Sequence, residues 1–397
     1  MDQKNIIQEK AVALAQDNNL LLSWATGTGK SLAALKIAAT IPNKKWYIVC
    51  KEIPHIKNWY NEFKKHKINP SNFEVFCYDS LHKYSDTEAN LILDEVHSLT
   101  PLRISLLLKI KFNKVICLSA LVPDEKKELL KSFISFTEYH ISLSEAIELK
   151  LIPMPKIYIV DVFLKNSEPT EIHILKKGNK DKRQIVKCSF KDRYTVFRKY
   201  TDVELHIMCT QQEKYLLINA EIDYYKTQYF KIRKEWAQYV WLQATLKRKN
   251  YLADIKTEKA KEILSLLKDK RLICFTGSID QCNMLGKDYA IHSETNTDNN
   301  EIITKFNNLE ISKLFAVKML REGVNLEQID SSLIIQLDNQ ILSFIQMLGR
   351  CIRGLLPECY ILVVKNTQDE VYLNTALTGF NTDYLYKFSD LKLGKTT

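Results

Sequence analysis

Short apolar runs alternate with helix-length segments over the first 150 residues of the chain. Five runs are nearly continuous in apolar residues: LLLSW (20–24), WYIVC (46–50), FEVFC (73–77), LILD (91–94) and KVICLS (114–119). Such strands, separated by helices, are typical of a parallel sheet that is covered on both faces. The pattern returns from residue 271 in RLICFTG, KLFAVKM, SLIIQLD and CYILVVK. The sequence therefore predicts an α/β fold with two tandem parallel-sheet domains.

The segment between these two units has a different pattern. From Phe163 to Asp202 apolar and polar residues alternate, in EIHILKK, RQIVKCSF and RYTVFRKY, which predicts short antiparallel strands. Residues 211–249 contain no Gly or Pro and predict a long helix or a helix pair. We therefore expect an N-terminal domain (1–150), a connector (151–258) with a β-rich insert (about 163–202) and a helical segment (about 211–249), a C-terminal domain (259–375) and a tail (376–397).

The chain is basic, with 57 Lys and Arg against 47 Asp and Glu, a formal charge of +10. The stretch 163–202 carries 11 Lys and Arg against 5 Asp and Glu, so it contributes six of these ten charges. This charge favours nucleic acid as a partner, although many lysine-rich surfaces are only solvated. Tyr194, Phe197 and Tyr200 are interleaved with the basic residues. The insert is thus either a nucleic-acid-binding hairpin or a small β-subdomain whose aromatic residues form its own core.

The cysteines and the lengths of the apolar runs indicate in which cellular compartment the protein is expected. The nine cysteines include no CxxC pair, which argues against a zinc knuckle or a disulfide framework. Cys50, Cys77, Cys117 and Cys274 lie in or beside apolar runs, where small buried hydrophobic residues are expected. No apolar run approaches the ~18 residues of a membrane span, and MDQKNIIQEK has no signal-peptide pattern. We expect a cytoplasmic protein with no membrane partner.

A glycine-containing loop, ATGTGKS (25–31), follows the first apolar run and precedes the strong helix former SLAALKIAA. Glycines in such a loop let backbone N–H groups point at phosphate oxygens, and the following helix adds the positive end of its dipole. Lys30 would neutralise phosphate charge, and the Ser31 hydroxyl would bind Mg²⁺. Trp24 stands where the GxxxxGK[ST] pattern has its first glycine. The predicted ATP-binding residues of this loop are Thr26, Gly27, Thr28, Gly29, Lys30 and Ser31.

A second candidate group, LILDEVHS (91–98), is an apolar strand that ends in two carboxylates. A nucleotide site needs one acid to hold Mg²⁺ and a second to activate the attacking water, and Asp94 and Glu95 fill these roles in that order. We interpret His97 as a residue that couples this site to neighbouring elements. Alone, the same sequence could be a strand end with solvated acids.

A third group, FIQMLGRCIR (344–353), places two arginines three residues apart on one face of a predicted helix. A guanidinium aimed at a transferring phosphate stabilises its developing charge. Arg350 and Arg353 belong to the second domain, whereas the phosphate loop belongs to the first. ATP would then lie in the cleft between the domains, and hydrolysis would change how they close.

Taken in order, these segments resemble the motifs of the superfamily 2 helicases along nearly the whole chain. The loop ATGTGKS resembles motif I, DEVH motif II, LSAL (118–121) motif III and QMLGRCIR (346–353) motif VI. Motifs Ia, Ib, IV and V resemble IVCKEIPHIKNWYNEF (48–63), YDSL (78–81), CFTGSIDQCNML (274–285) and REGVNL (321–326). The resemblance implies two RecA-like domains that use ATP and Mg²⁺.

The resemblance also assigns roles to further residues. Gln8 lies where the family often has a glutamine that recognises adenine, and Gln346 joins the arginines of motif VI in the catalytic set. Glu322 and Gly323 of motif V join the ATP-binding set. The positions expected near the nucleic-acid backbone are Lys51, Ser80, Thr276 and Asn325.

Two positions depart from the family pattern: Leu121 replaces the threonine that usually ends motif III, and Met347 replaces the first arginine of QRxGR. Within the superfamily the motifs are most similar to those of phage UvsW-like and XPB-like repair and branch-migration helicases. We therefore expect a monomeric, ATP-dependent DNA helicase or translocase that acts on forked or branched DNA, in a bacterial cytoplasm if it is phage-encoded. An RNA helicase, a duplex translocase without strand separation and a catalytically silent adaptor remain as alternatives.

Overall fold

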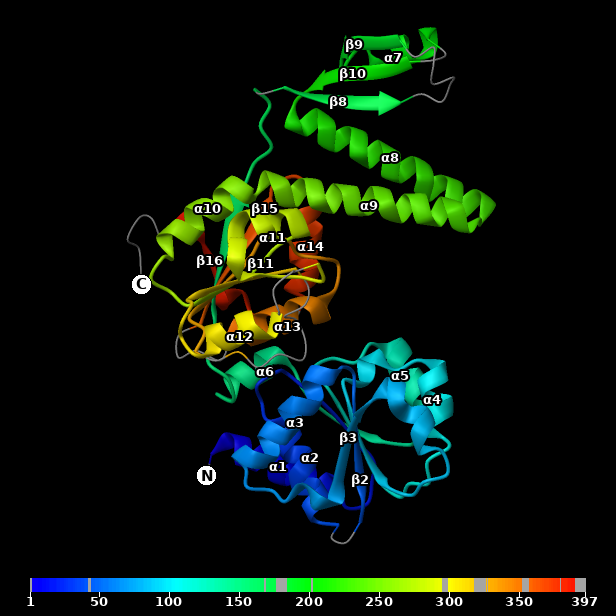
Figure 1. The fold of residues 1–397 in the computed structure, drawn as a ribbon, viewed down its shortest axis with the longest axis vertical. Helices are drawn as coiled ribbons and strands as arrows, with labels where there is room; N and C mark the ends of the chain where they lie inside the picture. The colour runs from blue at the N-terminus through cyan, green and yellow to red at the C-terminus, as the bar shows by residue number, and fades with distance from the viewer. Residues whose placement is uncertain are drawn as a thin grey trace.

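A computed structural model describes residues 2–41, 44–167, 169–175, 184–200, 203–294, 299–317, 326, 328–351, 357–378 and 380–389. Two α/β domains follow one another along the long axis of the molecule, and an arm projects from the second (Figure 1). Within the described ranges, no helix has both the length and the apolar composition to cross a membrane.

The first domain is built on a six-stranded parallel sheet in the order β3-β2-β4-β5-β1-β6. Its strands are β1 (Leu20–Trp24), β2 (Trp46–Cys50), β3 (Phe73–Cys77), β4 (Asn90–Asp94), β5 (Val115–Ser119) and β6 (Thr137–Ile141). Its helices are α1 (Gln3–Leu14), α2 (Lys30–Ala39), α3 (Ile53–Lys65), α4 (Pro101–Leu107), α5 (Asp124–Lys131) and α6 (Leu143–Glu148). All five predicted strands are present, and every residue of β1, β2 and β5 is buried.

Burial on both faces explains why these strands are nearly continuous in apolar residues. Leu20, Leu22 and Trp24 of β1 pack into one cluster together with residues of α1, α2, α3 and α6. Leu21 points to the opposite face, where α4 and α5 cover the sheet. Strands with two covered faces have no side that tolerates polar residues.

The second domain has a seven-stranded parallel sheet in the order β12-β13-β11-β14-β15-β7-β16. Its strands are β7 (Lys156–Val162), β11 (Leu272–Phe275), β12 (Ala290–Ile291), β13 (Lys313–Ala316), β14 (Ser331–Ile334), β15 (Glu358–Val364) and β16 (Leu385–Lys387). Its helices are α10 (Thr257–Leu266), α11 (Ile279–Gly286), α12 (Asn299–Asn307), α13 (Ile341–Cys351) and α14 (Gln368–Ala376). The prediction of two tandem parallel-sheet domains is thus confirmed.

Two strands of this sheet lie outside the range expected for the C-terminal domain. We expected 151–258 to be a connector and 376–397 a tail, but β7 pairs with β15 over seven residues and β16 pairs with β7. The physical reason is that β15 has β14 on only one side, so its other edge requires a partner. The chain therefore enters the second domain before it leaves to form the arm.

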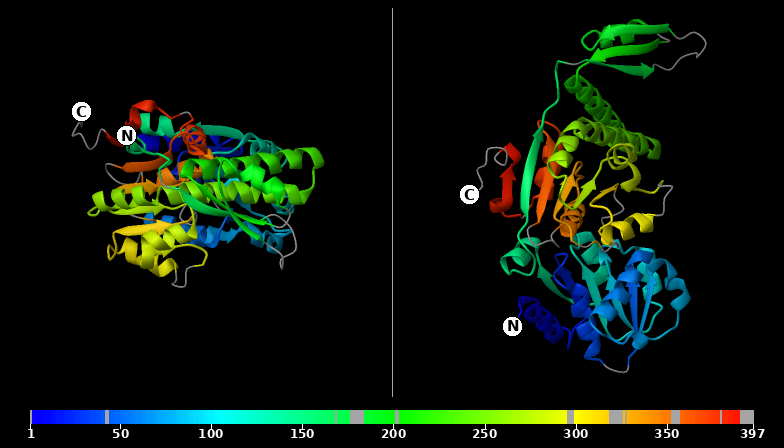
Figure 2. Two further views of the ribbon diagram at one scale, coloured as in Figure 1. Left: turned by 90° about the horizontal axis from the view of Figure 1, so that it is seen from above. Right: turned by 60° about the vertical axis from the view of Figure 1, so that its left-hand side comes forward.

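The arm consists of a small three-stranded sheet followed by a helical hairpin. The sheet contains β8 (Thr170–Leu175), β9 (Gln184–Ser189) and β10 (Val203–Cys209), with α7 (Arg193–Lys199) packed on it. The hairpin consists of α8 (Gln211–Ile232) and α9 (Glu235–Ile255), which correspond to the predicted helix pair. Figure 2 shows from two further sides how the arm extends away from the second domain.

The prediction of antiparallel strands for 163–202 is wrong in two respects. RYTVFRKY forms α7 rather than a strand, because Val196, Phe197 and Tyr200 at helical spacing pack on the small sheet. Helix α7 carries the chain back to the end of the sheet where β9 began, so β10 starts there and runs parallel to β9. Strand β8 pairs with β10 in the antiparallel direction. Phe197 and Tyr200 thus belong to a small core, whereas Tyr194 is 58% exposed.

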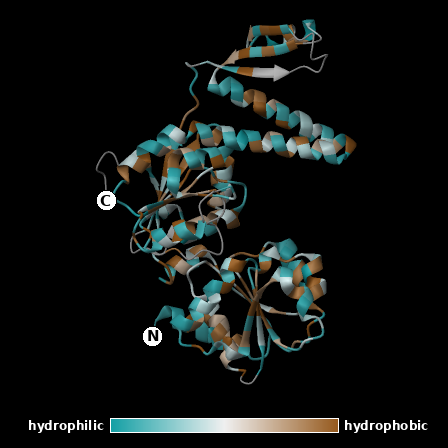
Figure 3. Ribbon diagram, viewed as in Figure 1, coloured by the Kyte–Doolittle hydropathy of each residue, from teal (hydrophilic) through white to brown (hydrophobic). Residues whose placement is uncertain are grey.

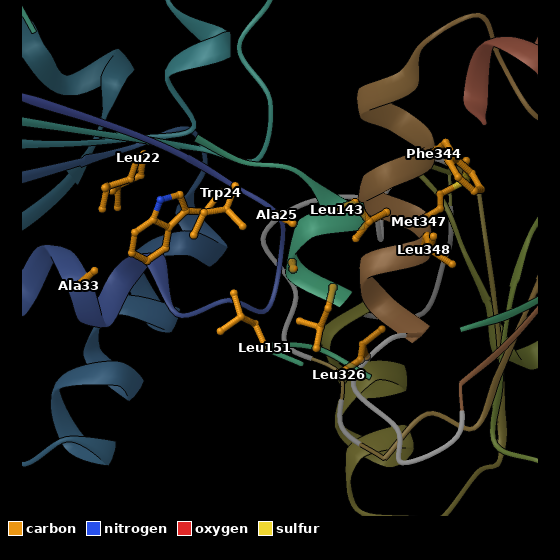
Figure 4. Close-up of a cluster of buried hydrophobic side chains, with 14 of the residues drawn as sticks. Leu22, Trp24, Ala25, Ala33, Leu143, Leu151, Leu326, Phe344, Met347 and Leu348 are labelled. Carbon is orange, nitrogen blue, oxygen red and sulfur yellow. The ribbon is translucent and has the colours of Figure 1, made fainter. Parts of the chain in front are cut away.

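One cluster of buried side chains extends across both domains (Figure 4). Leu22, Trp24 and Ala33 of the first domain belong to the same cluster as Phe344, Met347 and Leu348 of α13. Leu143 and Leu151 lie between the two groups in the close-up. The residue that replaces the first motif VI arginine, Met347, is fully buried here. Its side chain therefore serves packing next to the boundary between the domains.

Candidate active site between the two domains

The phosphate loop lies between β1 and α2, in the strand–loop–helix context that the sequence predicts. Gly27 and Gly29 have φ angles of 84° and 95°, in the left-handed region that favours glycine. A Cβ atom on Gly29 would also lie 2.7 Å from Nε2 of Gln8. Thr28 is buried and its hydroxyl donates to the carbonyl of Ala25 at 2.7 Å, which fixes the curve of the loop.

Lys30 is the first residue of α2, and its side chain points back along the loop. Its Nζ donates to the carbonyl oxygens of Trp24 at 2.7 Å and of Ala25 at 3.3 Å. Burial lowers the pKa of Lys30, while the negative charges of Glu95 and Asp94 act in the opposite direction. A lysine in this position presents a positive charge at the mouth of the loop, as phosphate binding requires.

The two carboxylates come from the end of β4. Asp94 accepts a hydrogen bond from Nε1 of Trp59 at 3.0 Å and one from the backbone N–H of Glu95 at 3.1 Å. Burial, reinforced by the charge of Glu95, raises the pKa of Asp94 to about 6. Glu95 has a φ of 53°, in the left-handed region, so the chain turns sharply directly after Asp94.

His97 lies between the ends of two strands. Its Nδ1 is 3.2 Å from Oε2 of Glu95 and 3.0 Å from Oγ of Ser119 at the end of β5. The Ser119 hydroxyl donates to the carbonyl of Leu121 at 2.8 Å. This chain of contacts joins the end of β4, in motif II, to the end of β5, in motif III.

A cavity of about 190 Å³ brings the sites of the two domains together. The first domain contributes Thr26, Gly27, Lys30, Ser31, Asp94 and Glu95 to its lining, and α13 contributes Gln346, Gly349 and Arg350. Gln346 is largely buried, with 7% exposure. Residues that are more than 300 positions apart in the sequence thus line one cavity.

A wider cavity of about 1210 Å³ adjoins the first and shares Gly27, Lys30, Ser31 and Glu62 with it. Gln8 lines it and is 2% exposed. Its Nε2 donates to the carbonyl of Gly29 at 3.4 Å, and within the described part of the chain its Oε1 has no hydrogen-bond partner. A buried acceptor without a donor fits a ligand that brings an N–H group, as the amino group of adenine does.

Helix α3 contributes four lining residues that the sequence analysis did not identify: His55, Asn58, Trp59 and Glu62. Their spacing of three and four residues places them on one face of the helix. His55 is buried, and among the described residues its Nδ1 has no hydrogen-bond partner. The spacing of these four residues could have indicated a shared face directed at the site. The same spacing, however, is found in any helix that packs one face on a sheet.

The other predicted positions lie apart from this cavity. Lys51 follows β2, and Ser80 lies in the 3₁₀ helix Tyr78–Tyr84. Thr276 follows β11, is only 6% exposed, and its hydroxyl donates to backbone carbonyls within the domain. The predicted positions Glu322, Gly323, Asn325 and Arg353 lie outside the described residues.

The donor set at the cavity fits Mg²⁺ with a nucleotide. Mg²⁺ is usually bound by one or two carboxylates together with water and phosphate oxygens. The Asp94 carboxylate and the Ser31 hydroxyl line the same cavity and would hold the ion. Across the described residues, no group of three or more His, Cys, Asp or Glu side chains is placed to hold a metal by itself.

Comparison with known families divides the chain in the same way. Residues 2–131 match the family described as "Type III restriction enzyme, res subunit", and residues 255–354 match "Helicase conserved C-terminal domain". Nucleoside triphosphatase I of Choristoneura fumiferana entomopoxvirus is 28% identical over 144 residues, which cover 28% of this chain and 22% of the relative. Nucleoside triphosphatase I of Amsacta moorei entomopoxvirus is 29% identical over 154 residues, which cover 30% and 24%. The aligned region spans less than a quarter of these curated relatives.

Solved structures share the whole fold. The helicase domain of Pyrococcus furiosus Hef superposes with a TM-score of 0.51 at 15% identity, covering 93% of this chain and 97% of that chain. S. cerevisiae Dbp5 bound to RNA and ADP BeF3 superposes with a TM-score of 0.57 at 12% identity, covering 98% and 90%. Since the two matched families fall on the two parallel-sheet domains in the order that the motifs require, the chain belongs to the superfamily 2 helicases.

Proposed function

We propose that this chain hydrolyses ATP in the cleft between its two α/β domains and uses the cycle to move along nucleic acid. The observation that carries the proposal is the cavity lined by both the phosphate loop and α13. A site completed by both domains links the state of the nucleotide to the closure of the domains, which is what a motor requires.

The proposed roles follow from charge and position. Lys30 neutralises phosphate charge, and Glu95 orients and activates the attacking water. Arg350, together with Gln346 and Arg353, stabilises charge on the transferring phosphoryl group. Gln8 recognises the base, with Thr26, Gly27, Thr28, Gly29, Glu322 and Gly323 around the nucleotide. Mg²⁺, held by Ser31 and Asp94, supplies further charge neutralisation when it is bound.

We propose DNA, forked or branched, as the track, with Lys51, Ser80, Thr276 and Asn325 near its backbone. The positive charge of the chain supports a polyanion but does not distinguish DNA from RNA. RNA is the second candidate, because the structurally similar Dbp5 is bound to RNA. Roles in repair or recombination, a phage origin and closeness to the UvsW-like and XPB-like branch stay predictions.

The test compares Lys30→Ala with Lys36→Ala, a variant of a lysine on the same helix whose Nζ pairs with Glu9 at 3.1 Å. ATPase activity is measured alone and with single-stranded DNA, plain duplex, forked duplex and RNA. We expect Lys30→Ala to lose turnover, Lys36→Ala to keep it, and nucleic acid to stimulate the wild type.

Each outcome discriminates between the candidates. Normal turnover in Lys30→Ala contradicts the assigned site, and an inactive wild type favours a silent adaptor. Stimulation by RNA alone favours the RNA helicase. Robust ATPase activity with no strand displacement on any substrate favours a duplex translocase.

A further inference from the structure

The helical hairpin of the arm leaves one face of α9 uncovered. Helices α8 and α9 pack through buried residues that include Tyr215, Ile218 and Ile222 of α8 and Ala244 and Tyr251 of α9. A capping box formed by Thr210 and Glu213 starts α8, and Arg233 in a left-handed conformation ends it. The hairpin is thus a well-defined element, and the positions of α9 that face α8 are known.

The opposite half of α9 carries large apolar side chains in contact with solvent. Trp236, Tyr239, Leu242 and Leu246 are 52%, 64%, 54% and 46% exposed. Their spacing of three, three and four residues aligns them along one side of the helix. We call these four residues the α9 stripe. Figure 3 shows apolar and polar residues mixed along the length of α9.

The surroundings of the α9 stripe are basic, although Lys247 pairs with Glu221 at 3.0 Å and Lys249 lies 3.9 Å from Asp338. Residues 222–250 contain seven Lys and Arg against two Asp and Glu. Lys231, Arg233 and Lys234 lie at the turn next to Trp236, and all three are exposed. The Arg233 guanidinium lies 5.1 Å from the centre of the exposed Phe230 ring. A surface that combines aromatic rings with positive charge is complementary to a polyanion that also offers flat apolar groups.

Single-stranded nucleic acid has these two properties together. Its phosphates attract Lys and Arg, and its unpaired bases stack on aromatic side chains with little dependence on sequence. A duplex presents its phosphates, but its base faces are already stacked inside, so it would leave Trp236 and Tyr239 without a partner. The charge and the rings therefore favour a single strand over a duplex.

The other end of α9 reaches a loop that belongs to helicase motif IV. Gln281 donates to the carbonyl of Ala253 in α9 at 2.7 Å and to the Thr257 hydroxyl at 2.9 Å. A Cβ atom on Gly277 would lie 2.3 Å from Cβ of Ala253, so the loop is in direct contact with the helix. At about 1.5 Å per residue, α9 places Trp236 roughly 25 Å from this loop.

We propose that the α9 stripe is an accessory binding site for single-stranded nucleic acid, on which unpaired bases stack as the strand leaves the motor domains. The inference rests on the proposed function, because it extends the same track outward along α9. At the ~3.4 Å per nucleotide of a fully stacked strand, the distance along α9 corresponds to at most about seven or eight nucleotides, and to fewer in an extended strand. A short strand would fill only the motor domains, whereas a longer one would also reach the stripe.

The experiment measures binding of fluorescein-labelled 10-mer and 25-mer single strands by anisotropy, without ATP. It compares the wild type, the double variant Trp236→Ala/Tyr239→Ala, and Trp236→Phe, which keeps a stacking ring. Tyr289→Ala is the matched control, since Tyr289 is 44% exposed and lies in the 3₁₀ helix Lys287–Tyr289 of the second domain, outside the α9 stripe. ATPase activity stimulated by the 10-mer is measured for each protein.

For the double variant we expect about a tenfold or larger loss of affinity for the 25-mer, with 10-mer affinity and 10-mer-stimulated ATPase activity unchanged. Trp236→Phe and Tyr289→Ala should bind both strands as the wild type does. Equal 25-mer affinities in the wild type and the double variant overturn the inference and leave the motor intact. A wild-type dimer that the double variant converts to a monomer also overturns it, because the stripe then joins two copies. A wild type that binds neither strand overturns the proposed function as well.

Discussion

Gly349 of α13 lies directly against Thr26 of the phosphate loop. A Cβ atom at position 349 would be 2.0 Å from Oγ1 of Thr26 and 2.9 Å from its Cβ. Within the described part of the chain, this hydroxyl is buried and has no hydrogen-bond partner. The absence of a side chain at one position of α13 is therefore what allows the second domain to close onto the loop.

Gly349→Ala should open this contact without harming either domain. Overpacking of this kind costs about 1–3 kcal/mol, so we expect kcat/KM for ATP to fall roughly 5- to 100-fold. The melting temperature should stay the same or rise, because alanine favours a helix over glycine. Steady-state ATPase assays and thermal unfolding measure the two effects.

The same clash provides an internal control through a double-mutant cycle. Thr26→Gly removes the atoms that an alanine at 349 would meet, so Gly349→Ala should cost less in that background than in the wild type. Equal costs in both backgrounds would show that the two residues do not act through this contact.

Trp59→Phe should weaken the site through Asp94. The substitution keeps an aromatic ring on α3 but removes the N–H that donates to Oδ2 of Asp94 at 3.0 Å. Hydrogen bonds to charged groups contribute about 1.5–3 kcal/mol, so we expect ATPase activity to fall about tenfold and the Mg²⁺ concentration for half-maximal rate to rise.

Trp46→Phe is the matched control for this prediction. Trp46 is 1% exposed in β2, and its indole N–H has no hydrogen-bond partner among the described residues. Its replacement should change ATPase activity and Mg²⁺ dependence less than twofold. If both variants behave alike, the indole hydrogen bond of Trp59 does not position Asp94.

The strands and the phosphate loop could be predicted because local sequence determines them. WYIVC and KVICLS can only be buried on both faces, and Gly27 and Gly29 must adopt left-handed conformations between a strand and a helix. The meeting of Arg350 with Lys30 in one cavity was expected from chemistry rather than from local pattern, because a guanidinium of the second domain was assigned to the phosphate that the loop of the first domain binds.

The elements that were predicted wrongly or missed depend on contacts that are distant in sequence. RYTVFRKY fits a strand or a helix, and only packing of Phe197 on the small sheet decides for α7. The three residues of β16 become a strand only because β7 offers an edge. The face of α3 that carries His55 and Trp59 resembles an ordinary buried face until Asp94 is placed next to it.

The stability of the protein should depend on pH through Asp94. A carboxyl whose folded-state pKa lies near 6, above its ordinary 3.8, binds its proton more tightly when the protein is folded. Its contribution to stability is therefore present at low pH and is lost as the pH rises from about 4 through about 6. Without Mg²⁺ and nucleotide, Asp94→Asn should be more stable than the wild type at pH 7, and the difference should shrink towards pH 4.5.

Urea unfolding at pH 4.5, 5.5 and 7 measures this difference. Groups that do not interact with Asp94 titrate equally in both proteins, so the change of the difference with pH reports on Asp94 together with its charged neighbours Glu95 and Lys30. A gap between Asp94→Asn and the wild type that stays constant over this range would show that Asp94 titrates near its ordinary value.

The last prediction concerns the junction of the arm with the second domain, where a fully buried ion pair lies. Nζ of Lys256, at the end of α9, is 2.7 Å from Oδ2 of Asp369 and 2.7 Å from Oε1 of Gln336. Burial lowers the pKa of Lys256, and the carboxylate of Asp369 opposes this effect. Lys256→Met would leave Asp369 buried without its counter-charge, so we expect the free energy of unfolding to fall by about 3–5 kcal/mol.

Two comparisons separate this effect from the loss of any lysine. Lys261→Met removes the exposed pair with Glu258 on α10 and should cost less than about 0.5 kcal/mol. Lys256→Met/Asp369→Asn leaves no unpaired charge, because both replacement side chains are neutral. The Asn side chain can still accept a hydrogen bond from the backbone N–H of Val364, so the double variant should regain part of the lost stability. Urea unfolding of the three variants measures these differences. A cost for Lys256→Met no larger than that for Lys261→Met would mean that the buried pair does not anchor the arm.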